Sequence, residues 1–322
     1  MIRGRFAPSP TGYLHLGNAR TALVAWCAAR QAGGQWVIRI EDIDRDRSKA
    51  EYVTANLREL RWLGLTWDEG AELGGPYGPY EQHKRTEFYE AALRRLEQQP
   101  NIQLFNCYLS RKDLRELASA PHAHGAAPVY GSAERELNAH LKDSKQQAGK
   151  QPSLRLAMPN KAISFTDDLA GHQVLSVAEA MGDIVLKRAD GMWAYHLAVV
   201  VDDIAMNISQ VVRGDDLLTS TAAHLFLYEA LDATPPSYLH VPLLLDEHGE
   251  RIAKRRGGYT LTALQEQDVL AERVLGLLAY SLNLQPHLKL MSLAEVLEQF
   301  SIQRIPKKPF QLTAEHLSWL TT

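Results

Sequence analysis

Cysteine is scarce in this sequence, and long apolar runs are absent. The only cysteines among the 322 residues are Cys27 and Cys107, too few for a disulfide framework or a four-cysteine metal site. No run approaches the roughly 20 apolar residues needed to span a bilayer. The N-terminus shows neither the apolar core of a signal peptide nor a transit segment rich in serine and arginine. We therefore expect a cytoplasmic protein with no membrane association.

An excess of positive charge is also lacking. Lysine and arginine total 35 against 38 aspartates and glutamates, which gives a formal net charge of −3. A nucleic acid would therefore have to bind at a local basic patch rather than through the overall field of the protein. Hydrophobic residues make up 45% and charged residues 23% of the chain, as is ordinary for globular proteins.

Several common catalytic signatures are missing as well. The sequence has no G-x-x-x-x-G-K-[ST] loop, no G-x-S-x-G elbow, no H-E-x-x-H and no Rossmann glycine fingerprint. What is present is an alternation of short apolar strands with amphipathic helices over the first hundred residues. This alternation is typical of a parallel α/β sheet.

The expected elements follow from hydrophobic periodicity and from Gly and Pro positions. Strands are predicted at 2–7, 36–40, 103–109, 153–158, 162–166, 210–213 and 240–245, and helices at 18–33, 57–64, 81–98 and 217–231. The apolar run at 197–201 is predicted to be a buried parallel strand. The polar stretch at 118–151 indicates a loosely structured excursion within an insertion, and the chain after 256 is predicted to be helical.

The first segment with chemical content is residues 5–18. A proline-rigid loop leads into a helix N-terminus near Asn18, where free N–H groups favour a phosphate or carboxylate. Gly17 allows a flat ring to approach the backbone, and His15 supplies a donor for phosphate oxygens. An ordinary strand–turn–helix corner with a surface histidine explains this segment equally well.

The second segment is a basic loop at 251–256 followed by two glycines. It holds four cations, and it follows an apolar strand and a turn. Such a loop suits a triphosphate, although a solvated charge run is the usual meaning of this pattern.

The third group consists of charged and polar residues at predicted strand ends. Glu41, Tyr195 and Arg213 occupy positions where open parallel sheets place ligand groups. Arg5 and Arg213 together are suited to clamp a dicarboxylic amino acid. The alternative is an ordinary ion pair of Glu41 with a neighbouring arginine.

Taken together, these segments resemble the glutamyl-tRNA synthetases, which are class I enzymes. His15-Leu16-Gly17-Asn18 stands in the place of their HIGH motif, and the basic loop stands where the family carries KMSKS. Residues 39–44, 74–82, 194–203 and 212–217 are also similar to family segments. The resemblance runs from residue 2 to about residue 260, and more loosely to the C-terminus.

The resemblance implies a Rossmann-like parallel sheet split by an inserted α+β subdomain, followed by a C-terminal helical segment. It implies that L-glutamate is bound by Arg5, Ala7, Ser9, Glu41, Tyr195 and Arg213. It implies that ATP is bound by His15, Gly17, Asn18 and Lys254, of which His15, Asn18 and Lys254 act in catalysis. ATP and Mg²⁺ are the implied cofactors, and a tRNA is the implied acceptor.

The implied domains are the two halves of the catalytic domain at 1–100 and 191–240, an acceptor-binding-like insertion at 101–190, and a KMSKS-like loop with a helical stem-contact segment at 241–322. From the length we expect no anticodon-binding domain. It favours the short paralogues that attach glutamate to queuosine in the anticodon loop of tRNA(Asp), and we expect a monomer. Two alternatives stay open: an atypical or truncated enzyme that charges tRNA(Glu), and a non-catalytic paralogue that binds tRNA or glutamate.

The short paralogues usually hold a zinc ion in the insertion through C-x-C, a tyrosine and a further cysteine. The corresponding residues here are Cys107, Leu109, Tyr130 and Glu134. One thiolate and one phenol do not supply the four donors of a tetrahedral zinc site, and histidines at 122 and 124 are a weak substitute. We predict no structural zinc and no other protein-held metal.

Overall fold

The computed structural model describes residues 1–110, 113, 130–252 and 259–322. Its centre is a seven-stranded sheet with the order β3-β2-β1-β9-β10-β6-β7. The strands are β1 (Arg3–Phe6), β2 (Gln35–Ile38), β3 (Glu69–Gly70), β6 (Ala162–Asp167), β7 (Gly171–Ser176), β9 (Gln210–Gly214) and β10 (Ser237–Val241). All neighbouring strands are parallel except β6 and β7, which form an antiparallel hairpin. The predicted α/β class is confirmed.

Helix α1 (Leu16–Gln31) packs against both β1 and β9, and it carries the largest buried face of the N-terminal half. It ends at Gln31, and Gly33 follows the cap residue with a φ of 60°, a conformation that favours glycine. A Cβ at Gly34 would lie 2.2 Å from the Ile2 carbonyl oxygen, so that residue 34 must be glycine for the chain to enter β2. Arg20, 1% exposed, donates to Ser281 and to the Pro242 carbonyl, which fixes α1 to the C-terminal segment.

Helix α7 (Tyr195–Ala205) occupies the residues predicted as a buried parallel strand at 197–201, and that prediction is wrong. Residues 197–203 are all buried, because α7 is enclosed by α3 (Thr86–Gln98), α8 (Ser220–Ala230) and β8 (Ile184–Lys187). A helix that is buried on every side carries an apolar run without the period of an amphipathic helix. Such a run does not differ from a buried strand in periodicity.

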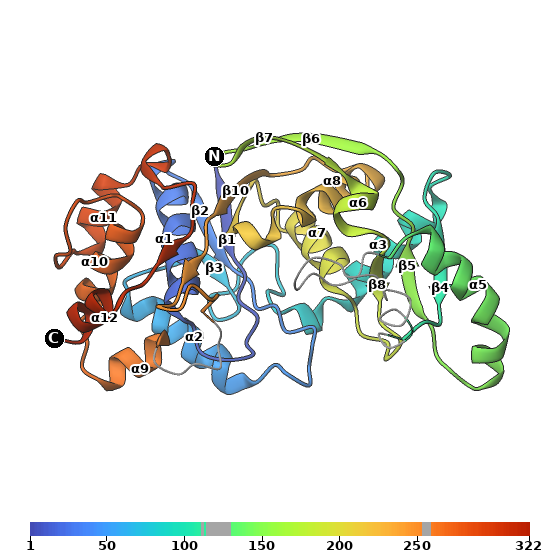
Figure 1. Cartoon of the computed structure of the whole chain (residues 1–322), viewed down its shortest axis with the longest axis horizontal. Coiled ribbons are helices and arrows are strands. Elements are labelled where there is room, and N and C mark those ends of the chain that lie inside the picture. Colours follow the sequence, from blue (N-terminus) through green and yellow to red (C-terminus); the bar gives the residue numbers. More distant parts are fainter. Residues whose placement is uncertain (111–112, 114–129, 253–258) are drawn as a thin grey trace.

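The insertion contains a three-stranded antiparallel sheet of β4 (Leu104–Cys107), β5 (Ser153–Leu156) and β8, together with α5 (Ser132–Gln147) and α6 (Val177–Met181). Helix α5 contradicts the loosely structured excursion predicted there, whereas residues 118–129 of that prediction lie outside the described residues. The hairpin β6–β7 leaves this region and extends the central sheet along β10. Figure 1 shows α5 and the small sheet at one end of the molecule.

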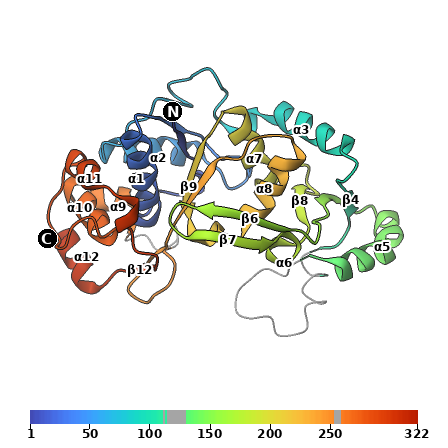
Figure 2. The same cartoon turned by 90° about the horizontal axis from the view of Figure 1, so that it is seen from above.

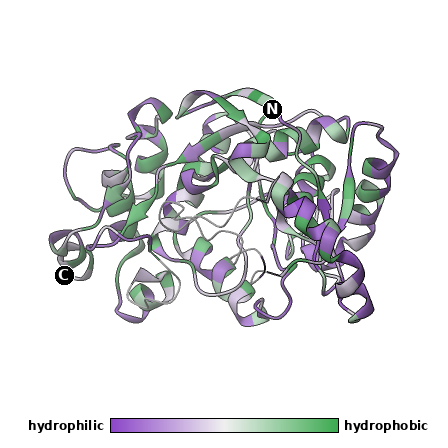
Figure 3. Ribbon diagram, turned by 45° about the vertical axis from the view of Figure 1, so that its right-hand side comes forward, coloured by the Kyte–Doolittle hydropathy of each residue, from purple (hydrophilic) through white to green (hydrophobic). Residues whose placement is uncertain are grey.

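The C-terminal segment forms the opposite end of the molecule (Figures 1 and 2). It contains α9 (Leu261–Glu266), α10 (Ala271–Ser281), α11 (Leu293–Gln299), α12 (Ala314–Thr321) and the parallel pair β11 (Leu244–Leu245) and β12 (Phe310–Gln311). Among the described residues, the other elements are α2 (Ala50–Trp62) and short 3₁₀ turns at Gln82–Lys84, Asp215–Leu217 and Ile302–Arg304. Hydrophobic residues concentrate along the central strands and the helices that cover them (Figure 3). Within the described part of the chain, no helix is both long and apolar enough to cross a membrane.

Candidate active site

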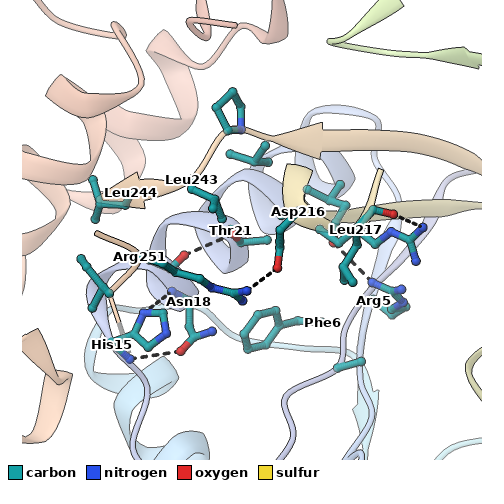
Figure 4. Close-up of a pocket in the computed structure, with 18 residues that line it drawn as sticks. Arg5, Phe6, His15, Asn18, Thr21, Asp216, Leu217, Leu243, Leu244 and Arg251 are labelled. Carbon is teal, nitrogen blue, oxygen red and sulfur yellow. Dashed lines mark hydrogen bonds and ion pairs between the residues drawn. The ribbon is translucent and has the colours of Figure 1, made fainter. Parts of the chain in front are cut away.

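A pocket of about 190 Å³ opens at the carboxyl ends of β1 and β9 (Figure 4). From β1 the chain continues to β2 and β3 on one side, and it returns through β9 and β10 on the other. The boundary between β1 and β9 is therefore the switch point of the sheet, where open α/β sheets bind their ligands. Arg5 reaches the pocket from β1 and Arg213 from β9, whereas Ala7 directly follows β1 and Asn18 lies at the start of α1.

His15 and Asn18 form a reciprocal cap at the N-terminus of α1. The His15 Nδ1 accepts from the Asn18 backbone N–H at 3.2 Å, and the Asn18 Oδ1 accepts from the His15 backbone N–H at 3.2 Å. Because Nδ1 is an acceptor, the neutral ring carries its proton on Nε2. A Cβ at Gly17 would lie 3.0 Å from His15 Nδ1, so glycine at this position keeps the ring in place.

Arg5 and Arg213 are both buried in the sheet below the pocket, at 4% and 5% exposure. Arg5 donates from Nε to Asp203 Oδ1 at 3.4 Å and from Nη1 to the Val212 carbonyl at 3.3 Å. Arg213 donates to His224, His240, Thr221 and the Leu217 carbonyl. The protein thus occupies four of the five N–H groups of Arg213, whereas the two hydrogen bonds of Arg5 leave three of its N–H groups for a ligand.

Arg39 forms ion pairs with both Glu41 and Asp203, and Asp203 also accepts from Arg5. Arg39 is fully buried and donates to Asp203 Oδ1 at 2.6 Å and to Glu41 Oε1 at 3.1 Å. Burial raises the pKa of Glu41, and Arg39 and Arg5 act against that rise. The ion pair of Glu41 with its neighbouring arginine, which the sequence offered as the alternative, is therefore present next to the candidate ligand site.

Tyr195 is the first residue of α7. Burial raises the pKa of Tyr195, with Arg213 and Arg5 lowering it and Glu41 raising it. The phenol therefore stays a hydrogen-bond donor at neutral pH. Its ring contacts the His224 ring edge-on, with centroids 5.8 Å apart.

Asp216 and Arg251 complete the pocket wall at the side away from Arg5. Arg251 Nη1 lies 2.5 Å from Asp216 Oδ2, and both residues line the pocket with Thr21 of α1. Asp216, Asp203, His224 and His240 were not predicted as site residues from the sequence. The signal for Asp203 was present, because two adjacent aspartates end the apolar run at 197–201 and buried carboxylates require cationic partners.

The predicted site residues thus fall into three groups. Arg5, Ala7, His15, Gly17, Asn18 and Arg213 line one pocket. Glu41 and Tyr195 lie next to it and do not belong to the described lining, and neither does the exposed Ser9. Lys254 lies outside the described residues.

A parallel sheet with a pocket at its switch point and a helix N-terminus beside that pocket is an arrangement that many nucleotide-binding α/β proteins share. The family model described as tRNA synthetases class I (E and Q), catalytic domain, matches residues 1–319, and the chain belongs to this family. It is accordingly a ligase of the aminoacyl-tRNA synthetase type.

Two similar proteins match over nearly their whole length. The glutamyl-Q tRNA(Asp) synthetase of Symbiobacterium thermophilum is 46% identical over 322 residues, covering 100% of this chain and 99% of the relative. That of Nitratidesulfovibrio vulgaris is 45% identical, covering 99% and 98%. The glutamate–tRNA ligase of Heliobacterium modesticaldum is 37% identical, covering 99% of this chain and 64% of the relative. The resemblance to the short branch is confirmed.

Among solved structures, the glutamate–tRNA synthetase of Elizabethkingia anophelis matches with a TM-score of 0.83 at 28% identity, covering 99% of this chain and 69% of that one. A glutamate–tRNA ligase of Elizabethkingia meningosepticum, solved in complex with its amino acid, matches with a TM-score of 0.82. The expected class I synthetase fold is confirmed.

The positions that would hold zinc in the insertion do not fit that metal. Cys107 donates to the Tyr130 hydroxyl at 3.4 Å, and both are buried with Leu109 in a small apolar cluster. The Glu134 carboxylate accepts from the Gly131 backbone N–H at 2.7 Å and caps α5. Within residues 1–110, 113, 130–252 and 259–322, no group of three or more His, Cys, Asp or Glu side chains forms a metal site.

Proposed function

We propose that this chain activates L-glutamate with ATP to form glutamyl-adenylate, and that it transfers the glutamyl group to queuosine in the anticodon loop of tRNA(Asp). The observation that carries the first step is the pocket itself. It combines two buried arginines, suited to a dicarboxylic amino acid, with a helix N-terminus suited to phosphate.

In this proposal Arg213 and Arg5 bind the carboxylates of glutamate through the N–H groups that the protein does not use. The Glu41 carboxylate has lone pairs beyond the one that accepts from Arg39, and these would accept from the ammonium group of the ligand. Tyr195 would donate from its hydroxyl. Ala7 and Ser9 would contact the ligand through the loop that follows β1.

For ATP we propose that the N-terminus of α1, with His15 and Asn18, faces the phosphates, and that Gly17 keeps this surface open. Lys254 and Arg251 would supply cations from the basic loop. The α-carboxylate of glutamate attacks the α-phosphorus, pyrophosphate leaves, and the mixed anhydride forms. The protein contributes position and charge stabilisation rather than a covalent step.

Magnesium would enter with the nucleotide. The carboxylate on the pocket wall, Asp216, is already paired with Arg251, and Mg²⁺ is commonly held by substrate phosphates and water with few protein ligands. When bound, it neutralises charge on the phosphate oxygens.

In the second step a hydroxyl of the tRNA attacks the carbonyl carbon of the adenylate, and AMP leaves. The identity of 45–46% to the two glutamyl-Q tRNA(Asp) synthetases, against 37% to the glutamate–tRNA ligase, supports queuosine as the acceptor. The similarity to the ligase supports a second candidate function, which is charging of the 3′ end of tRNA(Glu).

The test begins with glutamate-dependent exchange of pyrophosphate into ATP, without tRNA and then with tRNA. Labelled glutamate is next offered to tRNA(Asp) with and without queuosine, and to tRNA(Glu). Each tRNA is also tested after removal of its 3′-terminal adenosine. We expect labelling only of the queuosine-containing tRNA(Asp), whether or not the terminal adenosine is present. Labelling of tRNA(Glu) that depends on the terminal adenosine supports the second candidate, and absence of exchange under all conditions contradicts both.

A further inference from the structure

Arg213 lies in the middle of a continuous chain of buried hydrogen bonds. Asp167 Oδ2 is 2.6 Å from His240 Nδ1, and His240 Nε2 accepts from Arg213 Nε at 3.0 Å. On the other side, Arg213 Nη1 is 3.0 Å from His224 Nδ1, and His224 Nε2 is 3.0 Å from His196 Nδ1. The chain links β6, β10, β9, α8 and α7.

The donor properties of arginine fix the tautomer of every histidine in this chain. A guanidinium only donates, so His240 Nε2 and His224 Nδ1 must both be unprotonated acceptors. His240 therefore carries its proton on Nδ1 and donates it to Asp167. His224 carries its proton on Nε2 and donates it to His196 Nδ1, which leaves the His196 proton on Nε2. All three imidazoles are neutral, each in one defined form.

The third nitrogen of the Arg213 guanidinium, Nη2, is also held by the protein. Arg213 Nη2 donates to Thr221 Oγ1 at 2.8 Å and to the Leu217 carbonyl at 3.2 Å. Four of the five N–H groups of Arg213 are thus used within the described structure, and the fifth, on Nη1, remains for a ligand. The direction of that N–H is set by the two histidines that hold the plane of the guanidinium.

We propose that His240 and His224 are positioning residues that, as neutral imidazoles, aim the remaining N–H of Arg213 at the acidic side chain of the amino-acid substrate. The inference rests on the proposed function. It adds that the preference for glutamate over glutamine depends on two histidines that do not touch the substrate, because one well-aimed charged donor favours a carboxylate over an amide.

The surrounding charges favour the neutral forms. Burial lowers the pKa of His224 well below its usual value, and Arg213, His196, Arg5 and His240 lower it further. Burial also lowers the pKa of His240, with Arg213 acting in the same direction and with Asp167 and Asp215 acting against it. The Tyr238 ring stacks on His240, and the Tyr195 ring meets His224 edge-on. A proton on either histidine would remove an acceptor and place a second cation against the guanidinium.

Two pairs of variants separate the acceptor from the bulk of each ring. Asparagine places its oxygen near the Nδ1 position and glutamine near the Nε2 position, so His224→Asn and His240→Gln each keep an acceptor for Arg213. His224→Leu and His240→Leu do not. In the pyrophosphate exchange assay we expect the leucine variants to raise the KM for glutamate by about tenfold or more, as for loss of a hydrogen bond to a charged group. The KM for ATP should stay unchanged, and the ratio of kcat/KM for glutamate over glutamine should fall.

The asparagine and glutamine variants should recover most of the glutamate affinity, and His172→Leu, on the exposed part of β7, serves as the control. Leucine variants that fold and keep the wild-type KM for glutamate overturn the proposal. So does a rise in the KM for ATP that equals the rise for glutamate. Wild-type protein without glutamate-dependent exchange contradicts the proposed function itself.

The tautomers are measured independently of activity and of variant folding. Long-range ¹H–¹⁵N correlation spectra of wild-type protein labelled with ¹⁵N-histidine at pH 7.5 should show His240 protonated on Nδ1, and His224 and His196 protonated on Nε2. Assignment uses the asparagine and glutamine variants and His196→Asn. A charged His240 or His224, or the opposite tautomer at either, overturns the proposal even if a leucine variant fails to fold.

Discussion

Arg251 Nη1 lies 2.5 Å from Asp216 Oδ2 at the rim of the pocket, so a cation that faces the pocket is held by a carboxylate of the protein itself. The Arg251 side chain is 63% exposed and that of Asp216 is 23% exposed. An ion pair this open is weak, and a triphosphate carries enough charge to replace the carboxylate as the partner of Arg251.

Substitutions of the two residues should therefore change ATP binding in opposite directions. We expect Arg251→Ala to raise the KM for ATP by about tenfold, as for loss of one charge-assisted hydrogen bond. We expect Asp216→Asn to lower it, because the competing charge is removed. Steady-state exchange kinetics with varied ATP measure both, with Arg94→Ala on the exposed side of α3 as the control. Changes of the same sign would contradict the competition.

His15 has a structural role and a proposed catalytic role, and His15→Asn separates them. Asparagine is a favoured N-cap residue, so the cap on the Asn18 backbone N–H should survive and the melting temperature should stay near the wild-type value. The imidazole donor is lost, and adenylate formation should fall by about 100-fold, as when one donor to a developing oxyanion is removed. His15→Ala, which loses both roles, should also lower the melting temperature. Near-normal exchange in His15→Asn would contradict the catalytic role.

The sequence predicted the parallel strands at the switch point because each is a short apolar run next to a Gly or Pro turn. It did not predict α7, because residues 197–201 form an uninterrupted apolar run. Such a run has the same pattern in a buried helix and in a buried strand. It predicted Arg5 and Arg213 as site residues. The histidines that hold Arg213 were out of reach, because His240 and His224 come from separate elements that only the tertiary fold brings together.

Helix α5 and the small apolar cluster of the insertion could not be predicted either, because they also depend on tertiary contacts. The polar composition of residues 118–151 favours a loop, whereas the helix at Ser132–Gln147 is stabilised by the Glu134 cap and by packing of Leu137 and Leu141 on Cys107 and Tyr130. Most helical stability in proteins comes from such tertiary packing rather than from propensity.

Arg39 should be a large contributor to stability although it is a charged residue. It is fully buried among Asp202, Asp203 and Glu41, and its removal leaves these three carboxylates with less compensation. We expect Arg39→Met to lower the free energy of unfolding by about 3–5 kcal/mol, as for other broken buried ion pairs. Arg30→Met is the matched control: the pair of Arg30 with Asp68 is partly exposed, and its loss should cost about 0–1 kcal/mol. Equal losses in urea titrations of the two variants would contradict this account.

Zinc should be absent from the purified protein. The Glu134 carboxylate caps its own helix and Leu109 is buried where a second thiolate would be needed, so the cluster packs without a metal. Metal analysis should find far less than one zinc per chain, and treatment with a chelator should leave the melting temperature unchanged. A stoichiometric zinc ion whose removal lowers the melting temperature would contradict the prediction.

Acid should destabilise the protein through His196 before most carboxylates are protonated. Burial lowers the pKa of His196 from 6.5 to about 4, and Arg213 lowers it in the same direction. The folded state therefore binds this proton less readily than the unfolded state. The contribution to stability is complete above pH 6.5, declines as the pH falls below that value, and is gone once the pH falls through about 4.

A depression of this size corresponds to about 3 kcal/mol as an order of magnitude. We expect the free energy of unfolding, measured in urea at pH 7.5, 6.5, 5.5 and 4.5, to fall steadily across this series. In His196→Leu the decline should be smaller because one titrating group is gone, whereas His140→Ala on the surface of α5 should follow the wild type. Asp167, whose pKa is lowered through its hydrogen bond to His240 against the effect of burial, adds to the loss only below about pH 4. An identical slope in wild type and His196→Leu between pH 6.5 and 4.5 would show that His196 is not held neutral by the fold.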